Sequence, residues 1–522
     1  MSSVASEVPR QLAAPRYGAR VTAVLIVALG ALLAVIGCAV SDTTSQIVYG
    51  SLCLFLIGIA GAVIMSGRRG LRHSLASGQL GPYLGLSTAT IFGLASLTWT
   101  GPAPSGQGPP ILRSSVLFGM AVVGVALGCF TIGYRTLPVT PPRGVARWLQ
   151  RVIVTDRPVR SGQGAAWLLL TAAILGYAAA IVNGTFGYLS NAAVAVSSGN
   201  PLSQLLATIS SFSVFAVALS ANDYARQRGS WRLLSLGLLL TANSGLGAFS
   251  GGKELVALGF VAAFFGYAAT ARRLPLLPLA VGGLIFTFVI VPFVTSYRNA
   301  INVDGSRLSP ALVLQQVSQQ GIAFFLPAGQ GGAQLSLRET VQRISRVGDV
   351  AIIVQKTPSV IGDRPLSELL EAPILGLVPR VLWPDKPILA TGYLFSQQYY
   401  ELPPSVYTSS AVTPEGDLWR HGGWPVLVVG MLLLGVGVRT IDHASSDISG
   451  FPLRLFLVMS FFPLLVKQEA DVVSLLASLP SLLFGVALAA QLTIQRRRTV
   501  LNESGLPQRP AGMAPEPERH RS

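Results

Sequence analysis

Long apolar stretches recur along the whole chain and dominate its pattern of hydrophobic and polar positions. A helix needs about 20 apolar residues to cross the hydrocarbon core of a bilayer. Stretches that approach this length lie at about 21–40, 47–66, 82–99, 114–134, 165–183, 202–220, 232–249, 255–271, 275–296, 424–439, 451–466 and 472–493. The pattern therefore predicts an all-α, polytopic helical membrane protein with about twelve transmembrane spans.

Lys and Arg residues are distributed unevenly between the loops that join these stretches. If the N-terminus is placed inside and the spans alternate, most of the 38 basic residues fall in inside segments. The short outside loops then hold only Arg113, Lys253 and Lys467. Because basic residues collect in cytoplasmic loops, we expect both termini in the cytoplasm. The high usage of Ala, Arg and Gly suggests a bacterium, so the membrane would be a bacterial inner or plasma membrane.

This topology divides the chain into four parts. Residues 1–296 hold the first nine predicted spans, 297–423 form one large segment outside, 424–495 hold the last three spans, and 496–522 form a cytoplasmic tail. The outside segment contains a helix-capping sequence, SLRE, and a short apolar helix pattern, PLSELLEAPILGLV, so we expect a compact cap of helices and ordered loops. The tail is rich in Pro, Glu and Arg and is predicted to be disordered.

Composition agrees with a membrane protein and excludes several other classes. Charged residues make up only 11% of the chain and the mean hydropathy is +0.57, whereas soluble domains carry about 25% charged residues. The net charge of +16 follows from the positive-inside distribution, and no aromatic-and-basic pattern of nucleic-acid binding accompanies it. Cys38, Cys53 and Cys129 lie in apolar stretches without metal-ligand spacing, so we expect no disulfide, no structural metal and no cofactor.

Charged residues are rare in the predicted spans and gather instead in the outside segments. Coupled transporters usually bury ionisable residues near the membrane midplane, so this distribution argues against one. The charged outside segments are SGGKE at 250–254, SYRNAINVDGSR after the ninth span, the region of Arg343, Arg346 and Asp349, VPRVLWPDKP at 378–387, TPEGDLWRHGG at 413–423 and KQEAD at 467–471. The topology places these distant segments on one face of the membrane.

Such a set of residues suits a diphosphate and an attacking hydroxyl. Arg and Lys grip phosphate oxygens and stabilise charge on a leaving phosphate, and aromatic rings stack on sugars. The candidates for substrate binding are Lys253, Arg298, Arg343, Arg346, Arg380, Lys386, Arg420, Trp383 and Tyr399. A carboxylate or an imidazole would take the acceptor proton, and the candidates are Asp417, Glu415 and His421.

Each candidate also has a plain structural interpretation. Arg298 follows a span and could anchor it, Lys253 could be an ordinary loop cation, and Asp417 could be a cap or turn residue. Lys467 and Glu469 could simply pair with each other. The Gly-rich sequence AGQGGAQ at 328–334 lacks the GK[ST] of a phosphate loop and indicates a hinge.

The chain resembles the Wzy-like O-antigen and capsule polymerases, which join oligosaccharide repeat units. The resemblance is carried by GTFGYLS at 184–190, SGGKE, YRN at 297–299, VPRVLWPDKP and TPEGDLWRHGG. It implies an inverting, metal-independent glycosyltransferase of GT-C-like helical fold. The donor and acceptor would be polyprenyl-diphosphate-linked oligosaccharides at the outer membrane face, and a chain-length regulator would be a possible partner.

The resemblance also suggests roles for individual residues. It implies that Arg298, Arg380 and Lys386 bind the diphosphate, and it makes Asp417 the first choice for orienting or deprotonating the acceptor. This chain has Asp where Glu is more usual, with Glu415 two residues earlier, so the base stays open between Asp417, Glu415 and His421. Alternative functions are an O-antigen ligase, a flippase or exporter of lipid-linked sugars, and a scaffold in envelope assembly.

Overall fold

The computed structural model describes residues 18–494 with gaps at 68–69, 100–108, 137–143, 145–146, 148, 152–161, 184, 187–201, 287–289, 291–343, 379–381, 384–385, 388–390, 404–409, 447 and 449–451. Within these described residues every regular element is a helix, which confirms the all-α class. The long helices are α1 (Gly18–Ala39), α2 (Thr43–Ser66), α5 (Arg113–Thr136), α7 (Gly162–Val182), α11 (Ser230–Phe249), α12 (Lys253–Ala271), α21 (Gly423–Ala444) and α23 (Val472–Thr493). The shorter ones are α3 (Leu71–Ala76), α4 (Leu80–Thr88), α9 (Ser203–Ser210), α10 (Phe212–Arg226), α13 (Leu276–Ile285), α17 (Val347–Lys356), α18 (Ser367–Leu377), α19 (Thr391–Tyr400), α20 (Pro414–Arg420) and α22 (Arg454–Val466).

Nine segments of the described chain are helical, long enough and apolar enough to cross a membrane. They are Val21–Ala39, Thr43–Ser66, Leu80–Leu97, Arg113–Thr136, Gly162–Val182, Ser203–Arg226, Lys253–Ala271, Gly423–Ala444 and Val472–Thr493. Each coincides with a predicted span. The other three predicted spans correspond to α11, α13 and α22, of which α13 and α22 have only 10 and 13 residues. The structure is thus that of a multi-pass helical membrane protein, and the total of about twelve spans stays a prediction.

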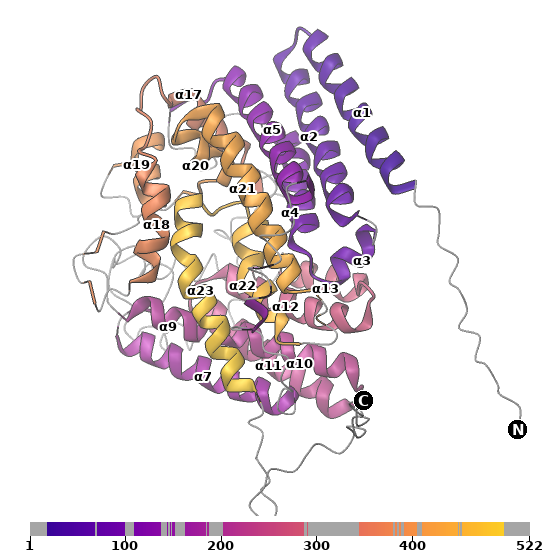
Figure 1. The fold of residues 1–522 in the computed structure, drawn as a ribbon, viewed down its shortest axis with the longest axis vertical. Helices are drawn as coiled ribbons and strands as arrows, with labels where there is room; N and C mark the ends of the chain where they lie inside the picture. The colour runs from indigo at the N-terminus through magenta and orange to yellow at the C-terminus, as the bar shows by residue number, and fades with distance from the viewer. Residues whose placement is uncertain are drawn as a thin grey trace, which may run out of the picture.

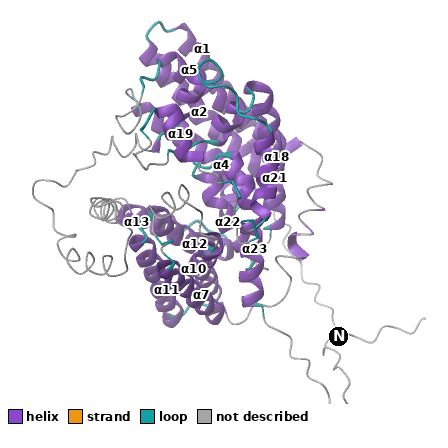
Figure 2. Ribbon diagram, turned by 90° about the vertical axis from the view of Figure 1, so that its left-hand side faces the viewer, coloured by secondary structure: helices purple, strands orange, loops and turns teal. Residues whose placement is uncertain are grey.

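The helices form two groups that meet at α22 and α23 (Figures 1 and 2). The first group contains α1, α2, α4 and α5 together with α17 to α21, and the second contains α7 and α9 to α13. Helix α22 contacts α4 of the first group and α10 and α12 of the second. Helix α10 lies in the middle of the second group, where every residue from 212 to 222 is buried. Helix α1 packs on α2, and most of its apolar surface stays exposed, as expected of a helix that faces lipid.

Small residues let the helices of the first group approach closely. Gly133 of α5 faces α21, and a Cβ added to it would lie 2.1 Å from the Leu432 carbonyl oxygen. Gly435 of α21 faces α5, and a Cβ added to it would lie 2.3 Å from the Phe130 carbonyl oxygen. Without a hydrophobic driving force between helices in lipid, such backbone contact is a main source of packing energy. The pair therefore fixes α21, and with it the preceding α20, against α5.

A buried carboxylate fixes the other end of α21. Asp442 accepts hydrogen bonds from the backbone N–H groups of Leu80 (2.7 Å) and Gly81 (3.1 Å), and from the Tyr134 hydroxyl (2.7 Å). These bonds satisfy orphan donors at the start of α4. Asp442 thus ties α4, α5 and α21 together.

The described part of the segment predicted as an outside cap is helical. Helix α17 is buried along most of its length and packs on α5, and α18 packs on α23. Helix α18, which ends at Leu377, lies within the PLSELLEAPILGLV sequence that was predicted as a helix. The SLRE sequence and residues 297–343 lie outside the described residues, so the compact cap as a whole stays a prediction.

Candidate functional site

The short helix α20 is the centre of the site, and its sequence explains its shape. Thr413 caps its N-terminus by accepting a hydrogen bond from the Gly416 N–H (3.1 Å), and Pro414 occupies the first turn. The helix ends at two glycines with positive φ, Gly422 and Gly423, which turn the chain into α21. All residues of α20 are buried, so its polar side chains must find partners inside the protein.

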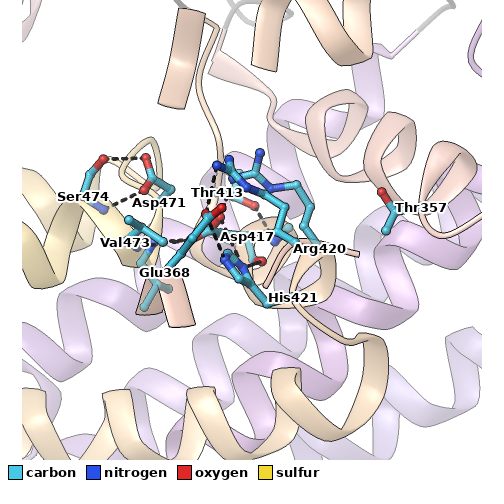
Figure 3. A network of polar contacts seen from close by, with 12 residues as sticks. Thr357, Glu368, Thr413, Asp417, Arg420, His421, Asp471, Val473 and Ser474 are labelled. Carbon is cyan, nitrogen blue, oxygen red and sulfur yellow. Dashed lines mark hydrogen bonds and ion pairs between the residues drawn. The ribbon is translucent and has the colours of Figure 1, made fainter. Parts of the chain in front are cut away.

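Asp417 joins α20 to the start of α23 (Figure 3). One carboxylate oxygen pairs with Arg420, and the other accepts hydrogen bonds from the backbone N–H groups of Val472 (2.8 Å) and Val473 (3.2 Å). Asp471 caps the same helix through the Ser474 N–H (2.7 Å). With both oxygens of Asp417 bound and its side chain fully buried, this carboxylate holds two helices together. The predicted role as base stays a prediction, and the geometry favours positioning.

Arg420 is a fully buried cation with incomplete hydrogen bonding. Besides Asp417, its guanidinium lies 5.7 Å from the ring centre of Phe395 and 5.9 Å from that of Tyr399, distances at which a cation is attracted to a ring face. Its Nε and Nη1 have no hydrogen-bond partner among the described residues. Because it is buried, Arg420 stabilises the site from within rather than meeting a substrate at the surface.

His421 connects this buried centre to the protein surface. Its Nδ1 lies 2.8 Å from the Asp417 carbonyl oxygen, which can only accept, so Nδ1 carries a proton. Its Nε2 faces the Glu368 carboxylate of α18 at 3.6 Å, and that carboxylate pairs with Arg364 at 2.9 Å. The Arg364 and Glu368 side chains are 24% and 29% exposed. We call Arg364, Glu368, Asp417, Arg420 and His421 the α20 network.

Glu415 is buried on the same helix and lies outside this network. Its side chain is 2% exposed, and its Oε2 has no hydrogen-bond partner among the described residues. Burial raises the pKa of this carboxyl to about 7, although the Glu415 backbone and the Thr413 hydroxyl oppose the rise. Glu415 could therefore exchange a proton near neutral pH, but its side chain is almost completely buried.

A second set of charges continues from α20 across the end of the bundle. Arg346 pairs with Asp349 (3.5 Å) and with Glu469. Lys467 pairs with Glu469 and with Glu254 of α12, each at 2.7 Å. The Tyr400 hydroxyl donates a hydrogen bond to Asp349. We call Glu254, Arg346, Asp349, Tyr400, Lys467 and Glu469 the Lys467 network. Residues 467–473 join it to the α20 network, because Asp417 binds the backbone at 472 and 473.

These two networks account for part of the predicted site. The structure brings together four segments that the topology had placed on one face, namely 253–254, 346–349, 415–421 and 467–471. Lys253 is the first residue of α12, next to Glu254. Tyr399 is buried, shares a hydrogen bond with Thr357 (2.6 Å) and packs on Arg420, so its ring faces the interior and not an open surface.

The remaining predicted residues lie apart or outside the described residues. Trp383 is 38% exposed, and the Lys386 ammonium donates to the Val378 carbonyl oxygen (3.1 Å) within its own loop. Arg298, Arg343 and Arg380 lie outside the described residues, so their predicted diphosphate contacts stay predictions.

Sequence reasoning missed the surface members of the α20 network. Arg364 and Glu368 are four residues apart, a spacing that indicates an ordinary pair on a helix surface. Their contact with α20 depends on tertiary packing, including the hydrogen bond from the Arg364 N–H to the Arg420 carbonyl oxygen (2.8 Å). The one available signal was a carboxylate in the helix that precedes VPRVLWPDKP, with an arginine in the loop just before that helix.

Comparison with known proteins finds one match. No curated protein and no solved structure matches the chain. Residues 178–460, more than half of the 522, match the family described as Domain of unknown function (DUF8712). This range includes α20 and the Arg364–Glu368 pair, and it ends before Lys467. The chain therefore belongs to the DUF8712 family.

Proposed function

We propose that the protein is a membrane glycosyltransferase that moves a glycan from a polyprenyl diphosphate to a hydroxyl of another lipid-linked glycan. The observation that carries this proposal is the arrangement around Glu368. Its carboxylate is partly exposed and lies 2.9 Å from Arg364 and 3.6 Å from His421, and His421 in turn contacts a fully buried aspartate–arginine pair. A partly exposed base beside a partly exposed cation is what transfer from a phosphate leaving group needs.

Glu368 is the group we assign to the acceptor hydroxyl. A general base must lie within hydrogen-bond reach of the proton that it removes, and Glu368 is a member of the α20 network that solvent reaches. His421 faces the same carboxylate oxygen and is held by the Asp417 carbonyl. In this proposal His421 carries a second proton on Nε2, and the resulting imidazolium positions Glu368 and stabilises its charge. Asp417 and Arg420 keep the whole arrangement rigid.

The diphosphate of the donor would be bound by cations at the same end of the bundle. Arg364 lies next to the proposed base, and Arg346 and Lys467 lie in the adjoining Lys467 network. Arg346 and Lys467 already share Glu469, so either could exchange that carboxylate for a phosphate. The resemblance to Wzy-like polymerases adds Arg298, Arg380 and Lys386 to this set as proposed ligands.

Substitution at Glu368 tests the proposal against a matched control. Glu371 lies on the same helix, is exposed and has the same chemistry. We expect Glu368→Gln to lower glycan transfer by about 10²- to 10⁴-fold, the usual contribution of a general base. Glu371→Gln should retain wild-type activity. The assay uses protein in lipid nanodiscs with a polyprenyl-diphosphate oligosaccharide and measures released polyprenyl diphosphate.

The outcomes separate the possible functions. Equal activity of Glu368→Gln and wild type would remove Glu368 from the mechanism. Release of polyprenyl diphosphate with transfer of one glycan only would indicate a ligase. Intact substrate in every reaction, with correctly folded protein, would reject glycosyl transfer in favour of a flippase or a scaffold.

A further inference from the structure

The end of α12 opposite the Lys467 network carries a hollow lined by basic residues. The hollow measures about 670 Å³ and is lined by Gly70, Leu71, Arg72, His73, Arg272 and Arg273. These residues come from the start of α3 and the end of α12, two helices that lie in contact (Figure 1). This volume falls in the range of small-molecule sites, about 300–1,000 Å³.

Among the described residues, no carboxylate balances the charges in this hollow. The described residues of its lining include no Asp or Glu. The side chains of Arg72, Arg272 and Arg273 are exposed, and none of them has an ion pair or a side-chain hydrogen bond among the described residues. At the other end of α12, by contrast, Lys467 and Arg346 are each paired with two carboxylates. Three unpaired arginines around one hollow repel one another and favour an anion between them.

The backbone has positive φ angles on both sides of this hollow. Arg272, which ends α12, has a left-handed conformation (φ 52°) that residues other than glycine seldom adopt. Gly70 has φ 78°, and a Cβ added there would contact no atom within 4 Å. The two arginines after α12 and the two basic residues of α3 therefore line an empty space without filling it.

We propose that this hollow binds the phosphate of an anionic phospholipid. Arginine suits phosphate because its planar guanidinium donates two parallel hydrogen bonds. A lipid is favoured over a soluble phosphate because the adjoining helix α13 offers an apolar surface for acyl chains. No residue of α13 is buried, and Leu276 and Leu277 are 65% and 76% exposed. Neither observation depends on glycosyl transfer, so this site stands or falls independently of the proposed function.

Lipid retention by the full-length protein tests the site. Protein purified in detergent is mixed with phosphatidylglycerol or phosphatidylcholine, and bound lipid is measured by native mass spectrometry. The site variant combines Arg72→Gln, Arg272→Gln and Arg273→Gln. The control variant combines Arg147→Gln, Arg151→Gln and Arg228→Gln and removes three charges at the same end of the bundle. Their location follows from two contacts: Gln150 bonds to the end of α21, and Arg228 bonds to Tyr267 near the end of α12. Thermal unfolding confirms that both variants are folded.

We expect wild type and the control variant to retain phosphatidylglycerol over phosphatidylcholine. The site variant should retain at least about tenfold less phosphatidylglycerol than wild type. Equal loss in both variants, or no loss in either, would overturn the site. A separate titration uses inorganic phosphate as the probe. Wild type could bind inorganic phosphate saturably, with loss of binding only in the site variant, and yet not retain phosphatidylglycerol. That result would keep the phosphate site but overturn its assignment to a lipid.

Discussion

At the scale of single residues, Asp417 joins two helices of the candidate site. It pairs with a fully buried arginine and caps a membrane-spanning helix. We expect Asp417→Ala to lower the free energy of unfolding by about 3–5 kcal/mol, because Arg420 would stay buried without its counter-charge. Denaturant unfolding of the protein in detergent measures this loss.

The exposed pair between Lys467 and Glu254 provides the comparison for Asp417. Its side chains are 41% and 46% exposed, and exposed pairs contribute at most about 1 kcal/mol. Glu254→Ala should therefore change the free energy of unfolding very little. Losses of similar, small size in both variants would show that Asp417 does not hold α20 and α23 together.

The raised pKa of Glu415 predicts a pH dependence of stability. Its pKa is about 7 in the folded protein and about 4.3 in an unfolded chain. The folded state therefore binds this proton more tightly, and stability falls as the pH rises from about 4 to 7. We expect thermal unfolding of the wild type to shift to lower temperature across this range, and Glu415→Gln to shift less. Asp471, whose pKa burial raises to about 6, acts in the same direction and keeps part of the slope.

A substitution of the exposed Glu371 controls for the loss of a carboxylate. Glu371→Gln should keep the wild-type dependence of unfolding temperature on pH, because Glu371 lies in solvent. If Glu415→Gln and wild type show the same slope, the proton of Glu415 is not coupled to folding.

At the scale of elements, the contact between α18 and α23 places Glu368 beside His421. Gly376 lies in this contact, and an added Cβ would lie 1.9 Å from the Ala477 carbonyl oxygen. We expect Gly376→Ala to destabilise the protein by about 1–3 kcal/mol through overpacking and to lower glycan transfer. Thermal unfolding and the nanodisc assay measure the two effects.

The usual effect of alanine in a helix makes this test sharp. Replacing a helical glycine by alanine normally stabilises by up to about 1 kcal/mol, so a net loss at Gly376 indicates backbone contact. Gly362→Ala, where a Cβ would meet nothing within 4 Å, is the control and should leave stability nearly unchanged. A Gly376→Ala variant as stable as wild type would contradict the close packing of α18 on α23.

The positions of most long helices could be predicted from the sequence, but the contacts between helices could not. Apolar length alone located nine spans, because a bilayer imposes one length scale on every crossing helix. The span predicted at 451–466 is longer than α22, which has 13 residues and begins at Arg454. The contacts of Asp417 with 472–473 and of Glu368 with His421 join residues about 50 positions apart, and Asp442 caps a helix more than 350 positions earlier. No local pattern encodes such pairings.

At the scale of the whole molecule, the two ends of the bundle differ in their charge balance. One end holds the paired charges of the Lys467 and α20 networks, and the other holds Arg72, Arg272 and Arg273, which have no ion pair among the described residues. The positive-inside rule predicts that the end with the unpaired arginines faces the cytoplasm. In a background with all three native cysteines replaced by alanine, we expect a membrane-impermeant maleimide to label Ser359→Cys in intact cells. Ser230→Cys should react only after the cells are permeabilised.

Both positions are exposed, so their reactivity reports the side of the membrane and not burial. Labelling of Ser230→Cys in intact cells, with Ser359→Cys protected, would invert the topology and place the candidate site in the cytoplasm. That result would exclude a reaction at the outer membrane face.

Product analysis of a single reaction tests the proposal that this protein polymerises lipid-linked glycans. Wild-type protein in lipid nanodiscs is given a polyprenyl-diphosphate oligosaccharide, and the products are separated by size while released polyprenyl diphosphate is quantified. We expect a ladder of lengthened glycans, with one polyprenyl diphosphate released for each unit added. Intact substrate, with neither ladder nor release, would contradict it.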